Sequence, residues 1–141
     1  MREQTRIVVQ TLLLIAGLVA SMTMGAEPAT GVDRQLISAE AMPNVPGYNL
    51  TAVTVELAPG ISVPSHVHDG FVFVYVLEGT VRSQLNDAEA IDYAAGDSWV
   101  EPPRTIHSLT QNTNETDVAR ILAVFVAREG AQLTTSGAIS Q

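Results

Sequence analysis

The chain has 141 residues, no cysteine and a formal net charge of −8 at pH 7, and all 7 of its basic side chains are arginines. This length fits one compact domain, and the lack of cysteine excludes disulfides as a source of stability. The acidic balance excludes nucleic acid as a partner, because its phosphates would be repelled.

Residues 1–26 are predicted to be a secretory signal peptide. Two arginines precede an apolar run at 7–20, and small residues then lead to Ala26, which is the pattern of such peptides. The run also approaches the roughly 20 apolar residues that span a bilayer, so an uncleaved N-terminal membrane anchor is the alternative. Cleavage after Ala26 predicts a periplasmic or secreted protein without a membrane segment, and it removes two arginines and one glutamate, which leaves 5 basic and 14 acidic side chains.

The remaining residues predict an extended arm followed by one all-β domain. Prolines and glycines interrupt residues 27–48, which favours an extended N-terminal arm. Between residues 49 and 130, short alternating or apolar runs are separated by turn residues, and this pattern predicts a single antiparallel β-barrel. The predicted strands are 50–58, 71–77, 80–85, 90–93, 98–101, 107–110 and 118–127, and residues 131–141 remain as a C-terminal tail.

The predicted strand 71–77 is apolar on both faces. The valines at 72, 74 and 76 share one face, and Phe71, Phe73, Tyr75 and Leu77 share the other. The valine face suits the interior of the barrel. The aromatic face needs a second cover, for which the N-terminal arm and the partner subunit of a homodimer are both open.

The three histidines of the chain are predicted to form a metal site. His66 and His68 are two residues apart, so on a strand their imidazoles project from the same face. His107 follows a Pro-Pro turn, where an antiparallel neighbour would bring it alongside. Neutral imidazole binds Fe, Zn, Ni, Mn or Cu well, and three such ligands leave positions open for water or substrate.

The spacing around these histidines resembles the two motifs of the cupin superfamily. The first motif matches Gly60-x5-His66-x-His68 and ends at Gly79, and the second matches Gly96-x5-Pro102-x-Arg104-x2-His107. The chain is most similar to small exported single-domain (type 2) cupins. The resemblance implies a jelly-roll fold, or double-stranded β-helix, with a divalent metal at the three histidines and a small-molecule ligand.

Three positions depart from the family pattern. The motif glutamate that completes the metal shell falls at Val72, which cannot ligate, and Arg104 stands where the second motif has glycine. The terminal asparagine is displaced by one residue, with Gln111 at its position and Asn112 next. A shell of three neutral imidazoles would bind a metal more weakly and favour an anionic substrate.

Several other polar side chains are candidates for the site. Glu101 ends a strand and would reach the barrel mouth as a substitute carboxylate, although an exposed surface position is the favoured interpretation. Arg104 either binds an anionic group of the ligand or pairs with a surface acid. Gln84 is a candidate polar residue of the pocket. Asp69 is expected to point away from the histidines, and Trp99 is expected to pack in the core or at its rim.

Three functions follow from the resemblance. The first is a metal-dependent enzyme that acts on a small molecule by oxygen-dependent cleavage of a ring or diketone, or by isomerisation. The second is a non-catalytic module that binds a metal or a small ligand in the cell envelope. The third is a degenerate cupin without metal, because fold alone is a weak guide to function. The sequence identifies no catalytic residue beyond the metal ligands.

Overall fold

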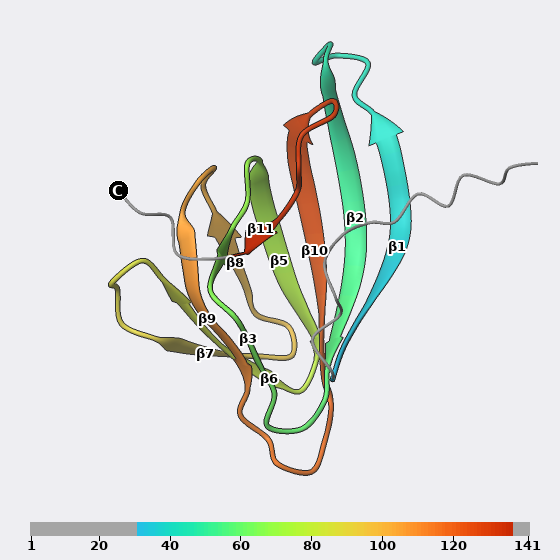
Figure 1. The fold of residues 1–141 in the computed structure, drawn as a ribbon. Helices are drawn as coiled ribbons and strands as arrows, with labels where there is room; N and C mark the ends of the chain where they lie inside the picture. Colours follow the sequence, from blue (N-terminus) through green and yellow to red (C-terminus); the bar gives the residue numbers. More distant parts are fainter. Residues whose placement is uncertain (1–30, 137–141) are drawn as a thin grey trace, which may run out of the picture.

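The computed structural model describes residues 31–136, which form two facing antiparallel β-sheets (Figure 1). The strands are β1 (Val32–Ala41), β2 (Tyr48–Leu57), β3 (Ser62–Val63), β4 (His66–Val67), β5 (Phe71–Glu78), β6 (Thr80–Leu85), β7 (Ile91–Ala94), β8 (Ser98–Glu101), β9 (Ile106–Asn112), β10 (Ala119–Arg128) and β11 (Thr135–Ser136). One sheet has five strands in the order β1-β2-β10-β5-β8, and the other has six, in the order β11-β4-β9-β6-β7 with β3 also paired to β9. Within the described residues, no helix is long and apolar enough to cross a membrane.

The seven strands predicted from the sequence are confirmed as β2 and β5 to β10. Four further strands lie where alternation is weak. β1 occupies the expected N-terminal arm and pairs with β2 from Val32 opposite Leu57 to Ala41 opposite Asn49. β11 lies in the expected C-terminal tail and pairs with β4, so both segments contribute to the sheets. The predicted signal peptide lies outside the described residues.

The core lies between the two sheets and is lined on one side by β5. Val72, Val74 and Val76 are buried, as the alternation predicts, together with Val81 of β6 and Phe125 of β10. Full burial of an apolar side chain of this size contributes about 1.5–3 kcal/mol. The apolar contacts therefore hold the two sheets together, and the polar side chains between them occupy a dry environment.

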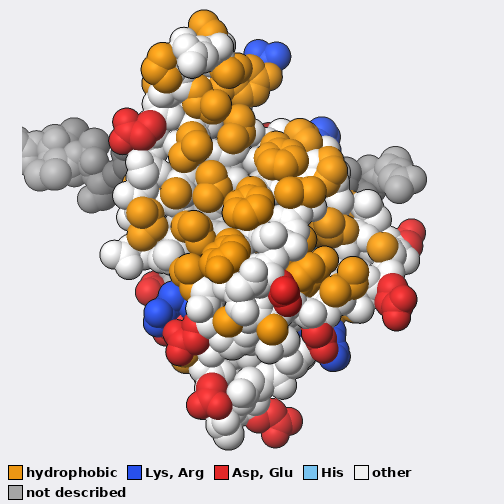
Figure 2. Space-filling model, turned by 180° about the vertical axis from the view of Figure 1, so that it is seen from behind, with side chains coloured by type: hydrophobic (Ala, Val, Ile, Leu, Met, Phe, Trp, Pro, Cys, Tyr) orange, Lys and Arg blue, Asp and Glu red, His pale blue; other side chains and the backbone are white. Residues whose placement is uncertain are grey.

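The outer face of the five-stranded sheet is apolar and open. The four odd-numbered side chains of β5, from Phe71 to Leu77, are 37–43% exposed. Figure 2 shows hydrophobic side chains gathered in the middle of this face, with charged side chains toward its rim. The N-terminal arm was one of two open alternatives for covering the aromatic face. Residues 32–41 of the arm do not cover it, because β1 lies at the sheet edge with β2 and β10 between it and β5.

Gly79, which ends the first motif, makes the tight connection between β5 and β6. Its φ of +75° lies in the left-handed region, which glycine adopts without a steric penalty. A Cβ at this position would lie 2.9 Å from the carbonyl oxygen of Val118. The motif glycine is thus required by close backbone packing at one end of the barrel.

Candidate metal centre

The pairing of two strands brings the three histidines together between the sheets. β4 pairs with β9 so that His66 lies directly opposite His107, and His68 lies two residues beyond His66. One potential ligand atom from each imidazole lies within 4.8 Å of the others. The side chains are nearly buried, at 8%, 7% and 3% exposure for His66, His68 and His107. The structure therefore juxtaposes the three residues that the motifs single out.

Backbone carbonyls determine which ring nitrogens of the first two histidines face the cluster. His66 Nδ1 donates to Pro64 O at 2.8 Å, and His68 Nδ1 donates to Leu133 O at 2.8 Å. A carbonyl oxygen only accepts, so each Nδ1 carries the proton and each Nε2 retains its lone pair. Hydrogen bonds of this kind orient metal-binding histidines. The contribution of Leu133 was missed, because it comes from the segment expected to be a tail.

Polar groups on β6 and β9 surround the third histidine. The Ser83 hydroxyl lies 2.8 Å from His107 Nε2, and Thr110 Oγ1 lies 3.0 Å from the same nitrogen. Both side chains are buried, and neither was predicted as a site residue. Ser83 could have been found from the sequence, since it alternates with the buried Val81 on β6.

Glu101 lies inside the cluster, so its interpretation as an exposed surface carboxylate is wrong. The side chain is 2% exposed because β8 pairs with β5 and places Glu101 opposite Val72. Its Oε1 accepts a hydrogen bond from Trp99 Nε1 at 3.0 Å and lies 3.2 Å from His107 Nδ1. Its Oε2 lies 3.5 Å from His68 Nε2 and has no hydrogen-bond partner. The structure thus places a titratable carboxyl group beside the three imidazoles.

Burial shifts the titration of all four groups toward their neutral forms. It lowers the pKa of His68 to about 4, and burial together with the two neighbouring imidazoles lowers the pKa of His107 to about 3. The pKa of His66 is lowered as well, mainly by burial. Burial raises the pKa of Glu101 to about 7, against the opposing effect of the Trp99 hydrogen bond. The imidazoles are therefore neutral at neutral pH, as metal ligation requires.

Two other predicted site residues point away from the cluster. Arg104 Nη1 donates to Asp69 Oδ1 at 3.0 Å, and both side chains are exposed, so Arg104 pairs with a surface acid. Its backbone N donates to His68 O at 2.7 Å. The prediction that Gln84 lines the pocket is wrong, because it lies on the outward face of β6 and donates to Ala88 O at 2.8 Å.

The displaced motif asparagine stabilises the fold. Asn112 is fully buried at 0% exposure, and its side-chain amide donates to Leu57 O, Ala58 O and Asp117 O at 3.1, 3.2 and 2.8 Å. These bonds join the end of β9 to the end of β2 and to the loop before β10. Asn112 thus connects the two sheets.

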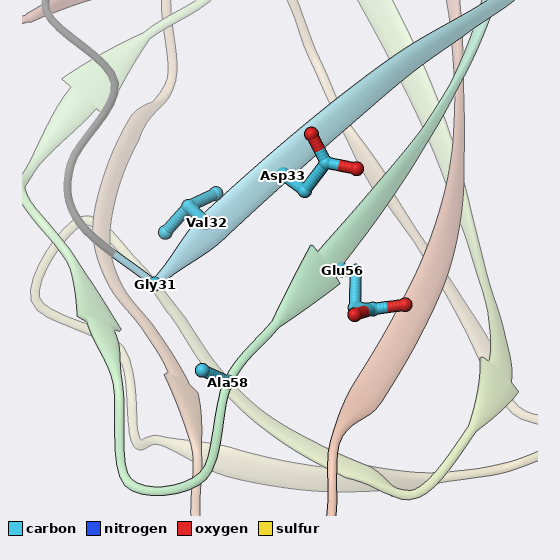
Figure 3. Close-up of a pocket in the computed structure, with 5 residues that line it drawn as sticks. All are labelled: Gly31, Val32, Asp33, Glu56 and Ala58. Carbon is cyan, nitrogen blue, oxygen red and sulfur yellow. The ribbon is translucent and has the colours of Figure 1, made fainter.

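A hollow beside β1 and β2 lies away from the histidines. Figure 3 shows its five lining residues, which are Gly31, Val32, Asp33, Glu56 and Ala58. The two carboxylates are cross-strand neighbours, and the Glu56 carboxylate is held by Arg120 at 2.7 Å. No donor set comparable to the histidine cluster lines this hollow.

The donor set between the sheets fits a divalent transition metal. It combines three neutral imidazoles with a carboxylate whose Oε2 lacks a partner, and nitrogen and oxygen donors of this kind suit Fe, Zn, Ni, Mn and Cu. Fold and site together define a double-stranded β-helix with a histidine centre between its sheets. The profile of the Cupin domain family matches residues 53–125, which is more than half of the chain. The chain therefore belongs to the cupin family.

Solved structures share this fold. The DMSP lyase DddQ from Ruegeria pomeroyi DSS-3 aligns with a TM-score of 0.62 and 16% identity over 81% of this chain and 55% of its own, so this chain spans about half of the lyase. KdgF from Halomonas sp. aligns with a TM-score of 0.59 and 22% identity over 74% of this chain and 86% of its own. The polyketide cyclase RemF from Streptomyces resistomycificus aligns with a TM-score of 0.58 and 18% identity over 79% of this chain and 75% of its own. A search of curated proteins found no match.

Proposed function

We propose that this chain is a small exported cupin that holds a divalent transition metal at its three histidines and acts enzymatically on a small molecule. The observation that carries the proposal is the buried convergence of His66, His68 and His107, with the Nδ1 protons of the first two engaged by backbone carbonyls. Their Nε2 lone pairs are thereby left for an ion. The names of two similar structures, a lyase and a cyclase, support catalysis on this fold.

A metal held there would supply Lewis acidity toward a small molecule bound at its open positions. The residues of the chain hold and orient the ligand atoms and keep the centre dry. Phe125 packs edge-on against His68 with ring centroids 5.2 Å apart, and Trp99 packs against His107 at 6.3 Å. We propose oxygen-dependent cleavage of a ring or diketone as the first reaction class to test, and isomerisation as the second. The metal is one of Fe, Zn, Ni, Mn or Cu.

A non-catalytic binding module is the second candidate. The observation that favours it is the low exposure of the three imidazoles, at 3–8%. Catalytic metal sites keep a coordination position open to substrate, whereas closed sites serve structural or storage roles. The third candidate, a degenerate cupin without metal, leaves the partnerless Glu101 Oε2 without a function.

Metal analysis separates these functions. Protein purified from its native compartment is expected to contain stoichiometric metal and to lose thermal stability on treatment with a chelator. His66→Gln is expected to lose both properties, and the exposed Asn44→Gln serves as the matched control. Wild-type protein without metal and without a response to chelator would refute both metal-dependent functions. Metal-loaded protein that consumes no oxygen with catechols, flavonols or β-diketones and isomerises none of a panel of small sugars would favour the binding module.

Export is a separate proposal that rests on the N-terminal pattern. We propose that cleavage after Ala26 releases the chain into the periplasm or the medium. Fractionation and N-terminal sequencing test this, with Glu27 expected as the first residue of the mature protein. Recovery of the full-length chain in the membrane fraction would instead establish the uncleaved anchor.

We also propose that the outer face of the five-stranded sheet pairs with a second copy of the chain. The face joins the exposed side chains of β5 to Val100 of β8 and to the outward side chains of β10. An apolar surface of this extent is typical of an interface, and a twofold contact uses the same patch on both subunits.

The oligomeric state tests this interface. Analytical ultracentrifugation is expected to give a dimer for wild type and a monomer for Phe73→Asp. The control is Ile91→Asp, which places the same charge at an exposed apolar residue of the other sheet. A monomeric wild type across the micromolar range, or equal dissociation of both variants, would refute the proposal.

A further inference from the structure

Two strands of the five-stranded sheet give access to the same point of the interior. Val72 on β5 and Glu101 on β8 are cross-strand partners, and both side chains face inward, at 1% and 2% exposure. Directly opposed residues have Cβ atoms about 4.5–5.5 Å apart. A carboxylate carried by either strand can therefore reach the same metal. In this chain Val72 on β5 has no ligand atom, and Glu101 on β8 supplies the carboxylate.

The geometry between Glu101 and His68 calls for a cation. His68 Nδ1 donates its proton to Leu133 O, so His68 Nε2 presents a lone pair. Glu101 Oε2 faces that lone pair at 3.5 Å and has no other partner. A well-formed hydrogen bond would need a separation of about 3.2 Å or less, so a hydrogen bond does not explain the pair.

The same separations match two ligands of one metal ion. With metal–ligand bonds of about 2.1 Å, neighbouring ligand atoms lie about 3.0–3.4 Å apart for right-angled and tetrahedral arrangements. Glu101 Oε1 lies 3.2 Å from His107 Nδ1, within this range, and Oε2 lies 3.5 Å from His68 Nε2, at its upper edge. Trp99 holds the other side of the carboxylate through Oε1 and so directs Oε2 toward the imidazoles.

The arginines that form ion pairs within the described residues pair with other acids and not with Glu101. Arg82 pairs with Asp92, Arg104 with Asp69, and Arg120 with Glu56 and Glu78. An ionised buried carboxylate without a cation is strongly destabilised and tends to take up a proton instead, in keeping with the raised pKa of Glu101. We propose that Glu101 is the fourth ligand of the metal centre, supplied by β8 in place of the carboxylate that the family motif puts on β5. This inference rests on the proposed metal-binding function.

The substitution has a consequence for the chemistry of the centre. One carboxylate lowers the net charge of a bound dication and adds a fourth protein ligand to the shell. A tetrahedral ion such as Zn²⁺ would then be closed to substrate, whereas an ion that accepts six ligands keeps two positions free. Catalysis at this centre therefore requires a metal ion that accepts six ligands.

Glu101→Gln tests the proposal with little change in shape. The amide oxygen still accepts from Trp99, and the amide NH2 can donate to the lone pair of His68. Without metal, the variant is expected to melt at the wild-type temperature or above. Its affinity for Co²⁺ and Ni²⁺, measured by competition with a chromophoric chelator, is expected to fall at least about tenfold. Glu129→Gln, which changes an exposed glutamate, is expected to bind both ions as wild type does.

The visible absorption of the Co²⁺-loaded protein distinguishes a ligand from a residue that only positions the histidines. A ligand role predicts a changed spectrum in Glu101→Gln and its recovery, with the affinity, when Val72→Glu is added. An unchanged spectrum or an unchanged affinity would overturn the role of Glu101 while leaving the histidine site intact. A wild-type protein that binds neither ion would instead refute the proposed function. If Glu101→Gln does not fold, Glu101→Asp replaces it, with weakened binding and an altered spectrum expected.

Discussion

Replacing Asn112 is expected to destabilise the fold far more than its polar character suggests. In Asn112→Ala, three carbonyl oxygens lose the two N–H donors that they share and the backbone N of Asn114 loses its acceptor at 3.0 Å. Each lost hydrogen bond costs about 1 kcal/mol net, and more where a buried group stays unsatisfied. The free energy of unfolding should therefore fall by about 3–4 kcal/mol.

Asn112→Asp separates these hydrogen bonds from side-chain volume. Aspartate matches asparagine in size, but it turns a carboxylate toward three carbonyl oxygens in a site with 0% exposure. At neutral pH it should destabilise the protein more than alanine does, because buried charge without a partner is costly. Urea unfolding at pH 7 measures the three proteins, with the exposed Asn44→Ala as control. A loss below about 1 kcal/mol for Asn112→Ala, or greater stability of the aspartate variant, would refute the argument.

Three further substitutions test other parts of the site and its frame. Arg104 has a φ of +63°, so Arg104→Gly relieves left-handed strain of about 1 kcal/mol. The free energy of unfolding should therefore stay unchanged or rise. A clear decrease in that free energy, measured by urea unfolding, would contradict this. Gly79→Ala brings a Cβ to 2.9 Å from Val118 O and should lower the melting temperature by several degrees in calorimetry, and an unchanged value would show that the turn relaxes. Ser83→Ala removes the hydroxyl at 2.8 Å from His107. It should weaken metal binding by about 10- to 100-fold, as measured by chelator competition. An unchanged affinity would show that the hydroxyl does not orient the ring.

The alternation of β5 and the spacing of the histidines were predictable because both are local or lie in the motifs. The two-residue period placed Val72, Val74 and Val76 inside. The same rule placed His66 and His68 on one face. β1 and β11 were not predicted as strands, because they are held at the sheet edges by backbone pairing and carry little apolar alternation.

The polar residues of the centre were predicted less well, although part of the signal was present. Trp99 was expected to pack in the core or at its rim, and Glu101 lies two residues further on the same strand face. Burial of the first therefore implies burial of the second. The same rule applied to Val81 favours Ser83 over Gln84 as the inward residue of β6. The distances from Glu101 to the imidazoles depend on the register between β5 and β8, which no local pattern specifies.

A motif records positions along the chain, whereas a metal requires donors at points in space. Because opposed residues on paired strands reach the same point, a donor can move between strands without moving in the site. Val72 breaks the family pattern in the sequence, and its cross-strand partner Glu101 places a carboxylate beside the same histidines. Loss of the motif glutamate is therefore not sufficient to infer loss of the metal centre. A chain that lacks it must be judged by the residue opposite, on the neighbouring strand.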